Sequence, residues 1–200
     1  AASAGADTTA WIAGVKAEID ELDGANYYDV IGLAGAVYGL AYVDEDFDPT
    51  AGEHAAASNL TELGAILATY QIPSSGGFAW NSAYVIPNDG DETIQETAYA
   101  VLALNELNRA TYQSEIMAAA DYMDSVQLGV GGWENYPTSG ENNEVTAEAL
   151  WGINTAYPLT EVWVCETGDC GHPDASFNSI QEAVAAIQIN GTIHVMAGIY

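Results

Sequence analysis

Two stretches that repeat each other, QIPSSGGF at residues 71–78 and QLGVGGW at residues 127–133, decide the fold of this 200-residue chain. Each contains a glutamine, a Gly-Gly pair and an aromatic residue, and the two glycine pairs are 55 residues apart. A similar helical stretch follows each loop, TAYAVLAL at residues 97–104 and TAEALWGI at residues 146–153. Self-similarity at a long period is typical of repeated supersecondary units. We therefore predict repeated units of two helices each.

Apolar residues at helical spacing extend this pattern over the first 158 residues. Gly32, Gly35 and Gly39 lie three and four residues apart within one expected helix, although each glycine lowers helix propensity by about 1 kcal/mol relative to alanine. The stripe therefore predicts close packing of this helix against a neighbour. The six expected helices span about residues 11–22, 28–42, 53–70, 91–108, 111–127 and 143–156.

The Gly-Gly-aromatic loop followed by a helix of the Glu-Thr-Ala-Tyr-Ala type resembles the α/α-toroid repeat of the terpene cyclase and protein prenyltransferase superfamily. The same repeat occurs in some polysaccharide lyases and in complement-type thioester domains. The resemblance covers roughly residues 7 to 158 and implies about half of a complete toroid. Residues 44–48 are only loosely like the acidic cluster of the cyclases, and the thioester motif Cys-Gly-Glu-Gln is absent. The resemblance therefore implies a fold rather than an activity.

After Pro158 the pattern changes to strand, helix and strand. Residues 161–165 are strand-like, residues 176–187 form an amphipathic helix, and an Asn-Gly turn leads into an alternating strand at residues 192–200. This tail resembles the capped first coil of right-handed parallel β-helix proteins of the pectate-lyase-like class. A single coil leaves a strand edge open, and the expected partner of that edge is a second copy or further β-helix coils downstream.

The predicted fold class is therefore mainly α, with α/α-hairpin repeats that form a partial toroid and a small β-helix-like strand-helix-strand segment at the C-terminus. We expect two domains. The first is the toroid-like helical domain of residues 1–158, and the second is the β-helix-like segment of residues 159–200.

The charge balance excludes several classes of partner. The chain has 29 acidic residues against two basic ones, Lys16 and Arg109, and a formal net charge of −27. Nucleic acids and anionic membrane surfaces are bound through Lys and Arg, so neither is expected as a partner. No run of 18 apolar residues exists, and we expect no membrane insertion. The hydrophobic fraction of 49% predicts a folded chain rather than an acidic disordered tail.

Two features favour a secreted or cell-surface protein. The small, uncharged residues 1–6 are similar to the region around a signal-peptidase cut. Cys165 and Cys170 are the only cysteines, and four residues separate them, which favours a disulfide across a tight loop in an oxidising compartment. A metal pair would lack its second half, and the Cys-x-x-Cys redox spacing is absent. Asn59 and Asn190 begin glycosylation sequons.

Two acidic loops are candidate calcium sites, because calcium takes about six to eight oxygen ligands in flexible geometry. In the first loop Pro49 and Ala55 occupy the positions where an EF-hand has its glycine and its last glutamate. The alternative for the second loop is a turn followed by a helix N-terminus, where acidic residues are favourable. The candidate ligands are Asp44, Asp46 and Asp48 in the first loop and Asn88, Asp89 and Asp91 in the second.

Aromatic residues that gather in the repeat loops, with carboxylates nearby, predict carbohydrate binding. Sugar faces pack on aromatic rings, while acids and amides bond to sugar hydroxyls. The alternative for Phe78 and Trp133 is that they fill gaps between helical hairpins, and a helix start explains Glu144 equally well. The candidate carbohydrate ligands are Trp80, Tyr84, Glu96, Trp133, Tyr136 and Glu144.

The function predicted from the sequence is a secreted, non-catalytic scaffold or surface-interaction module that self-assembles through its open C-terminal strand edge. One alternative is part of an extracellular polysaccharide lyase or another glycan-active enzyme. A second is a calcium-dependent carbohydrate-binding module, with extracellular polysaccharide as its partner. Two basic residues are few for a lyase, which needs a base and a cation beside the uronate. We therefore assign no catalytic residue.

Overall fold

The structure is a computed structural model that describes residues 5–23, 25, 28–85, 90–157, 159–165 and 176–196. The chain divides into two compact units, Ala1–Ala156 and Tyr157–Tyr200. This division lies two residues before the predicted one. The fold is mainly helical, as predicted, and each unit is described separately below.

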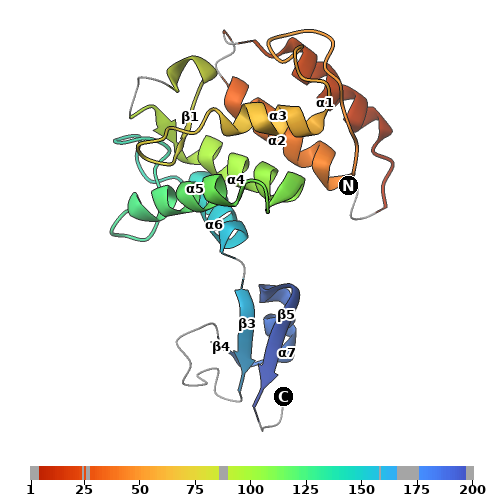
Figure 1. Cartoon of the computed structure of the whole chain (residues 1–200). Coiled ribbons are helices and arrows are strands. Elements are labelled where there is room, and N and C mark those ends of the chain that lie inside the picture. The colour runs from red at the N-terminus through yellow and green to blue at the C-terminus, as the bar shows by residue number, and fades with distance from the viewer. Residues whose placement is uncertain are drawn as a thin grey trace. The chain divides into compact units, whose positions relative to one another are not determined.

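The first unit is built from helices with one two-stranded antiparallel sheet (Figure 1). The sheet pairs two strands that flank a short 3-10 helix, Ser82–Tyr84. Its elements are α1 (Thr9–Glu21), α2 (Asp29–Tyr42), α3 (Leu60–Ala68), β1 (Phe78–Ala79), β2 (Glu92–Thr93), α4 (Ile94–Asn108), α5 (Gln113–Ser125) and α6 (Asn143–Ala156).

Helix α4 is the centre of this unit and contacts α2, α3, α5 and α6. Figure 1 shows α4 between the pair α2 and α3 and the pair α5 and α6. Its residues from Ala100 to Leu104 are all buried, so apolar side chains surround the helix axis instead of forming a single stripe. A helix that is apolar on all sides is stable only inside a core. The hydrophobic core of the unit therefore contains buried residues of α4 together with buried residues of the helices packed around it.

Two helices begin several residues later than predicted, one because of a side-chain cap and the other because a strand precedes it. Helix α3 begins at Leu60 instead of residue 53, since Asn59 accepts a hydrogen bond from the Glu62 amide at 2.9 Å. The Glu62 carboxylate accepts from the Ser58 amide at 2.7 Å, which completes a reciprocal arrangement like a capping box. Helix α4 begins at Ile94 instead of residue 91, because Glu92 and Thr93 form β2.

The two repeat loops have equivalent hydrogen bonds. The Gln71 side-chain amide donates to the Gly76 carbonyl at 2.8 Å, and that of Gln127 donates to the Gly131 carbonyl at 2.8 Å. Both glycines have left-handed backbone conformations, with φ of +86° and +95°. Only glycine adopts this region without a steric cost, so these positions require it.

The aromatic residue that ends each loop is also held in the same way. The Phe78 amide donates to the Thr97 hydroxyl at 2.9 Å, and the Trp133 amide donates to the Thr146 hydroxyl at 3.0 Å. Both aromatic side chains are buried. Each unit of the repeat therefore connects its loop to the helix that follows.

The second unit is a three-stranded parallel sheet with one helix, formed by β3 (Leu159–Val164), β4 (Ser176–Phe177), α7 (Ile180–Ala186) and β5 (Ile187–Val195) in the order β4-β3-β5. Val162, Val164 and Ala183 form its small core. The predicted Asn-Gly turn is wrong, because both residues belong to β5, which begins at Ile187 instead of residue 192. Residues 197–200 of the predicted strand lie outside the described residues.

Candidate functional site

A cavity of about 470 Å³ opens on the first unit where the N-terminal ends of α2 and α4 meet the loop that follows Trp133. We call it the aromatic cleft. It brings together three of the six predicted carbohydrate ligands and one residue of the predicted calcium loop. Its lining residues include Tyr28, Trp80, Asp91, Glu92, Glu96, Asn135 and Tyr136.

The short sheet places Trp80 beside Asp91. Strands β1 and β2 pair antiparallel, and the Trp80 amide extends this pairing by donating to the Asp91 carbonyl at 3.1 Å. The Trp80 indole N–H lies 3.4 Å from Oδ1 of Asp91. Tyr84 supports the indole from the 3-10 helix, with ring centroids 4.6 Å apart and planes at 32°. The cleft wall therefore consists of a supported indole next to a carboxylate.

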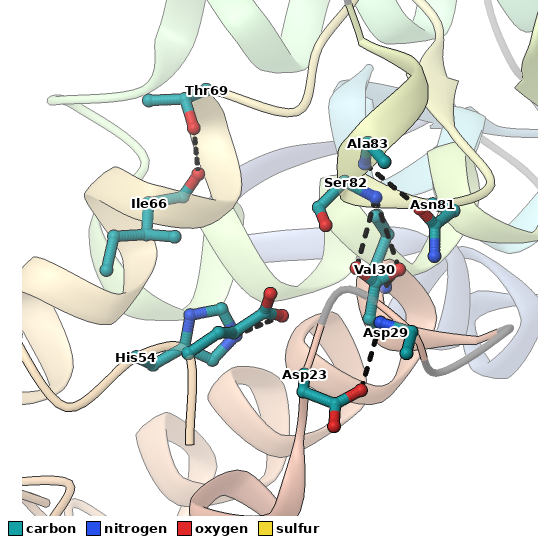
Figure 2. A network of polar contacts seen from close by, with 11 residues as sticks. Asp23, Asp29, Val30, His54, Ile66, Thr69, Asn81, Ser82 and Ala83 are labelled. Carbon is teal, nitrogen blue, oxygen red and sulfur yellow. Dashed lines mark hydrogen bonds and ion pairs between the residues drawn. The ribbon is translucent and has the colours of Figure 1, made fainter. Parts of the chain in front are cut away.

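A buried carboxylate connects α2 to the loop that carries these rings (Figure 2). Asp29 is the first residue of α2 and is fully buried. Its two oxygens accept from the Ser82 amide at 3.2 and 3.1 Å, and Oδ1 accepts from the Val30 amide at 2.8 Å. The Asn81 side chain accepts from the Ala83 amide at 3.0 Å and begins the 3-10 helix. Asp29 thus positions the loop between Trp80 and Tyr84.

A buried histidine lies in the same region, as Figure 2 shows. His54 is 1% exposed, and its Nε2 lies 3.3 Å from a carboxylate oxygen of Glu53 without hydrogen-bonding geometry. Burial lowers the pKa of His54, and the Asp29 carboxylate opposes this shift. Burial, with Asp29 and Asp23 nearby, raises the pKa of Glu53. Neither His54 nor Glu53 lines the cleft.

Glu96 in the first turn of α4 lines the cleft while only 3% exposed. The Thr93 hydroxyl donates to its carboxylate. Burial raises the pKa of Glu96, and Glu148 and Asp29 add to the shift through their charges. Burial also raises the pKa of Glu148, against the hydrogen bond at 2.9 Å from the Gln95 side chain. A carboxyl group with a raised pKa can donate a hydrogen bond as well as accept one.

The loop after Trp133 completes the cleft and also caps α4. The Asn135 carbonyl accepts from the Ile94 amide at 3.0 Å, and its side-chain oxygen accepts from the Gln95 amide at 2.9 Å. These bonds satisfy two donors that a helix N-terminus leaves unpaired. Tyr136 follows and is 56% exposed. The second repeat therefore supplies one side of a site whose other side comes from the first repeat.

The prediction of Trp133 as a carbohydrate ligand is wrong. Its side chain is 2% exposed, and its indole N–H donates to the Met123 carbonyl at 2.7 Å. No ring face is left for a sugar, and Trp133 fills the core as the alternative interpretation had it. Glu144 is exposed in the first turn of α6 and does not line the cleft. Tyr84 is 39% exposed and acts on the cleft through Trp80.

The first predicted calcium loop lies at a different cavity, lined by Asp44 and Asp46 together with other acids and not by Asp48. Asp46 Oδ1 accepts from the amides of Phe47 and Leu60 at 2.9 and 2.7 Å. In the second loop, Asn88 and Asp89 lie outside the described residues. The part of the chain that the structure describes contains no group of three or more acidic, His or Cys residues arranged to hold a metal ion. Calcium binding stays a prediction.

The predicted modification sites fall on defined elements. Asn59 is the N-cap of α3, and Asn190 belongs to β5. Glycosylation of either residue stays a prediction. Cys165 is disulfide-bonded, and Cys170, its predicted partner, lies outside the described residues.

Within the described ranges, no helix has the length and apolar character needed to cross a membrane. Comparison of the chain with protein-family models, with curated proteins and with solved structures yields no match. The chemistry of the aromatic cleft is therefore the basis for a proposal about function.

Proposed function

We propose that this chain is a non-catalytic, secreted or cell-surface interaction module that binds carbohydrate in the aromatic cleft. The observation that carries the proposal is the convergence of Trp80, Tyr28 and Tyr136 with Asp91 and Asn135 on one cavity. Rings pack on the C–H faces of sugars, and carboxylates and amides orient the hydroxyls. Ligand sites usually combine such apolar faces with a few convergent polar groups.

The exposure of two of the rings supports this role. Tyr28 and Tyr136 are 64% and 56% exposed, which is a poor arrangement for side chains that serve only the core. The two residues are far apart in the sequence, because Tyr28 precedes α2 and Tyr136 follows Trp133. Aromatic rings line the cavity, and backbone hydrogen bonds fix the segments that carry them. A sugar chain can therefore bind without a large rearrangement of the protein.

The test is binding of the purified chain to an array of extracellular glycans, followed by the same assay with Trp80→Ala. Trp151→Ala is the matched control, because Trp151 is 47% exposed on α6 and does not line the cleft. We expect binding that Trp80→Ala abolishes and Trp151→Ala retains. Absence of binding to every glycan, or equal loss in both variants, would contradict the proposal. Repeating the array with a chelator tests the calcium-dependent form of the same function.

A glycan-active enzyme is a second candidate, and Glu96 is the observation that favours it. Glycosidases place a carboxyl group of raised pKa beside a second carboxylate, and Glu96 and Asp91 line the same cleft. The assay is release of reducing ends from oligosaccharides that the array identifies. Turnover that Glu96→Gln abolishes would favour the enzyme, whereas binding without turnover favours the module. For a lyase, the readout is ultraviolet absorbance of the unsaturated product from pectin or alginate.

Self-assembly through the second unit remains part of the proposed scaffold role. Within the described sheet, β5 pairs with β3 alone, so its other edge has no partner strand there. Residues Ile187 to Val195 contain no charged side chain apart from the titratable His194. Lysines and prolines, which commonly protect strand edges, are absent from this strand. Light scattering of the purified chain tests the proposal, and a monodisperse monomer at all concentrations would contradict it.

A further inference from the structure

We infer that the aromatic cleft selects a glycan that carries protonated amino groups, such as an oligomer of glucosamine. This inference rests on the proposed function and names the class of its ligand. The site is the aromatic cavity itself, and the charges on its walls decide which sugars it accepts.

The walls of the cleft carry negative charge and no positive charge. Asp91 and Glu92 line it, and none of its described lining residues is a lysine or arginine. Both basic residues of the chain are held elsewhere. Lys16 pairs with Glu45 at 2.5 Å, and Arg109 donates to the Thr155 and Ala156 carbonyls at 2.9 and 2.6 Å. A uronate or sulfated sugar would therefore meet carboxylates without a cation to neutralise it.

The two carboxylates have acceptor capacity left for an ammonium group. Asp91 Oδ1 lies 3.4 Å from the Trp80 indole nitrogen, and Glu92 Oε2 accepts from the Gly90 amide at 2.8 Å. An ionised carboxylate offers about four lone-pair sites, and an ammonium group has three donors to fill them. Among the described residues, one protein group contacts each carboxylate, which orients it without saturating it.

The aromatic rings favour the same ligand. A cation over the face of a tryptophan or tyrosine is attracted by the ring quadrupole, most strongly at tryptophan. Trp80 lies beside Asp91, so one amino group can reach the ring and the carboxylate together. The net charge of −27 adds a long-range attraction for cationic ligands, which salt screens. Neutral sugars gain the ring contacts and the hydroxyl hydrogen bonds but no ion pair.

The experiment titrates the full chain with glucosamine, N-acetylglucosamine and galacturonate oligomers of equal length, followed by tryptophan fluorescence and calorimetry. We expect the glucosamine oligomer to bind about tenfold tighter than the N-acetylated one at a pH where its amines are protonated. This preference should disappear at a pH where they are neutral. The galacturonate oligomer should bind weakest.

Charge-removing variants distinguish attraction of the amine by the carboxylates of the cleft from attraction by the net negative charge of the whole protein. Asp91→Asn should lower the affinity for the glucosamine oligomer much more than the affinity for the N-acetylated oligomer, so that most of the preference for the amine is lost. Glu92→Gln serves if Asp91→Asn lowers the melting temperature strongly. Glu144→Gln is the control, because Glu144 is an exposed acid outside the cleft.

Each result has a defined meaning. Equal affinity for the amine and N-acetylated oligomers would overturn the inference and leave the proposed function in place. An amine preference that Glu144→Gln reduces as much as Asp91→Asn would also overturn it, because the attraction would then belong to the whole surface. Failure of all three oligomers and of the glycan array to bind would overturn the proposed function itself.

Discussion

Replacement of Asp29 by alanine removes the carboxylate that connects α2 to the loop between Trp80 and Tyr84. The amides of Val30 and Ser82 lose their acceptor in a site that is fully buried at Asp29. A buried donor without a partner costs about 1–3 kcal/mol. Removal of the buried charge returns part of this, since burying a carboxylate is itself costly. We therefore expect the free energy of unfolding to fall by about 3 kcal/mol.

Urea denaturation followed by far-ultraviolet circular dichroism gives this difference, and near-ultraviolet circular dichroism reports the paired rings of Trp80 and Tyr84. Asp29→Asn keeps the shape and one acceptor oxygen, so its loss should be smaller, about 1 kcal/mol. Asp124→Ala is the exposed control and should change stability by less than about 0.5 kcal/mol. If Asp29→Ala matches this control and the near-ultraviolet signal is unchanged, the carboxylate does not position the loop.

Three further variants test separate contacts. Glu96→Gln should stabilise the protein at neutral pH. The raised pKa of Glu96 means that the free energy of unfolding of the original chain falls as the pH rises through this pKa. Urea denaturation from pH 4 to 8 should show this fall in the original chain and not in the variant. Gly76→Ala should lower the melting temperature more than Gly131→Ala. Both positions have positive φ, costing about 1–2 kcal/mol, but only at Gly76 would the Cβ meet a backbone oxygen at 2.5 Å. Arg109→Met should cost about 1–3 kcal/mol in urea by leaving two α6 carbonyls unpaired; an unchanged midpoint would contradict this.

The repeat predicts the helical unit, and its alignment also indicates which of its residues lie in the core and which line the site. Trp133 aligns with Phe78, and both are buried with the same amide-to-threonine bond. The alignment thus identifies Trp133 as a core residue. The same offset of 55 aligns Trp80 with Asn135, and these two residues line the cleft together. The position two residues after the buried aromatic is therefore the one that each repeat contributes to the site.

Other features could not be predicted because they depend on contacts between distant segments. Asp29 at a helix start is typical of a solvated residue, and only the approach of Ser82, 53 residues later, makes it a buried acceptor. Helix α3 begins after the Asn59 cap, whereas the apolar spacing of residues 53–70 predicted a helix over the whole of that range. The Asn-Gly pair in β5 is the usual sign of a turn, and pairing with β3 overrides that preference.

Calorimetric titration with Trp80→Ala decides whether a glycan binds in the aromatic cleft. A glycan that the array identifies, or the glucosamine oligomer, is titrated into the original chain and into Trp80→Ala and Trp151→Ala at equal concentration. We expect saturable binding to the original chain and to Trp151→Ala, and an affinity for Trp80→Ala that is at least tenfold lower, about 1.4 kcal/mol. Equal affinity of all three proteins would contradict it, because binding would then occur outside the aromatic cleft.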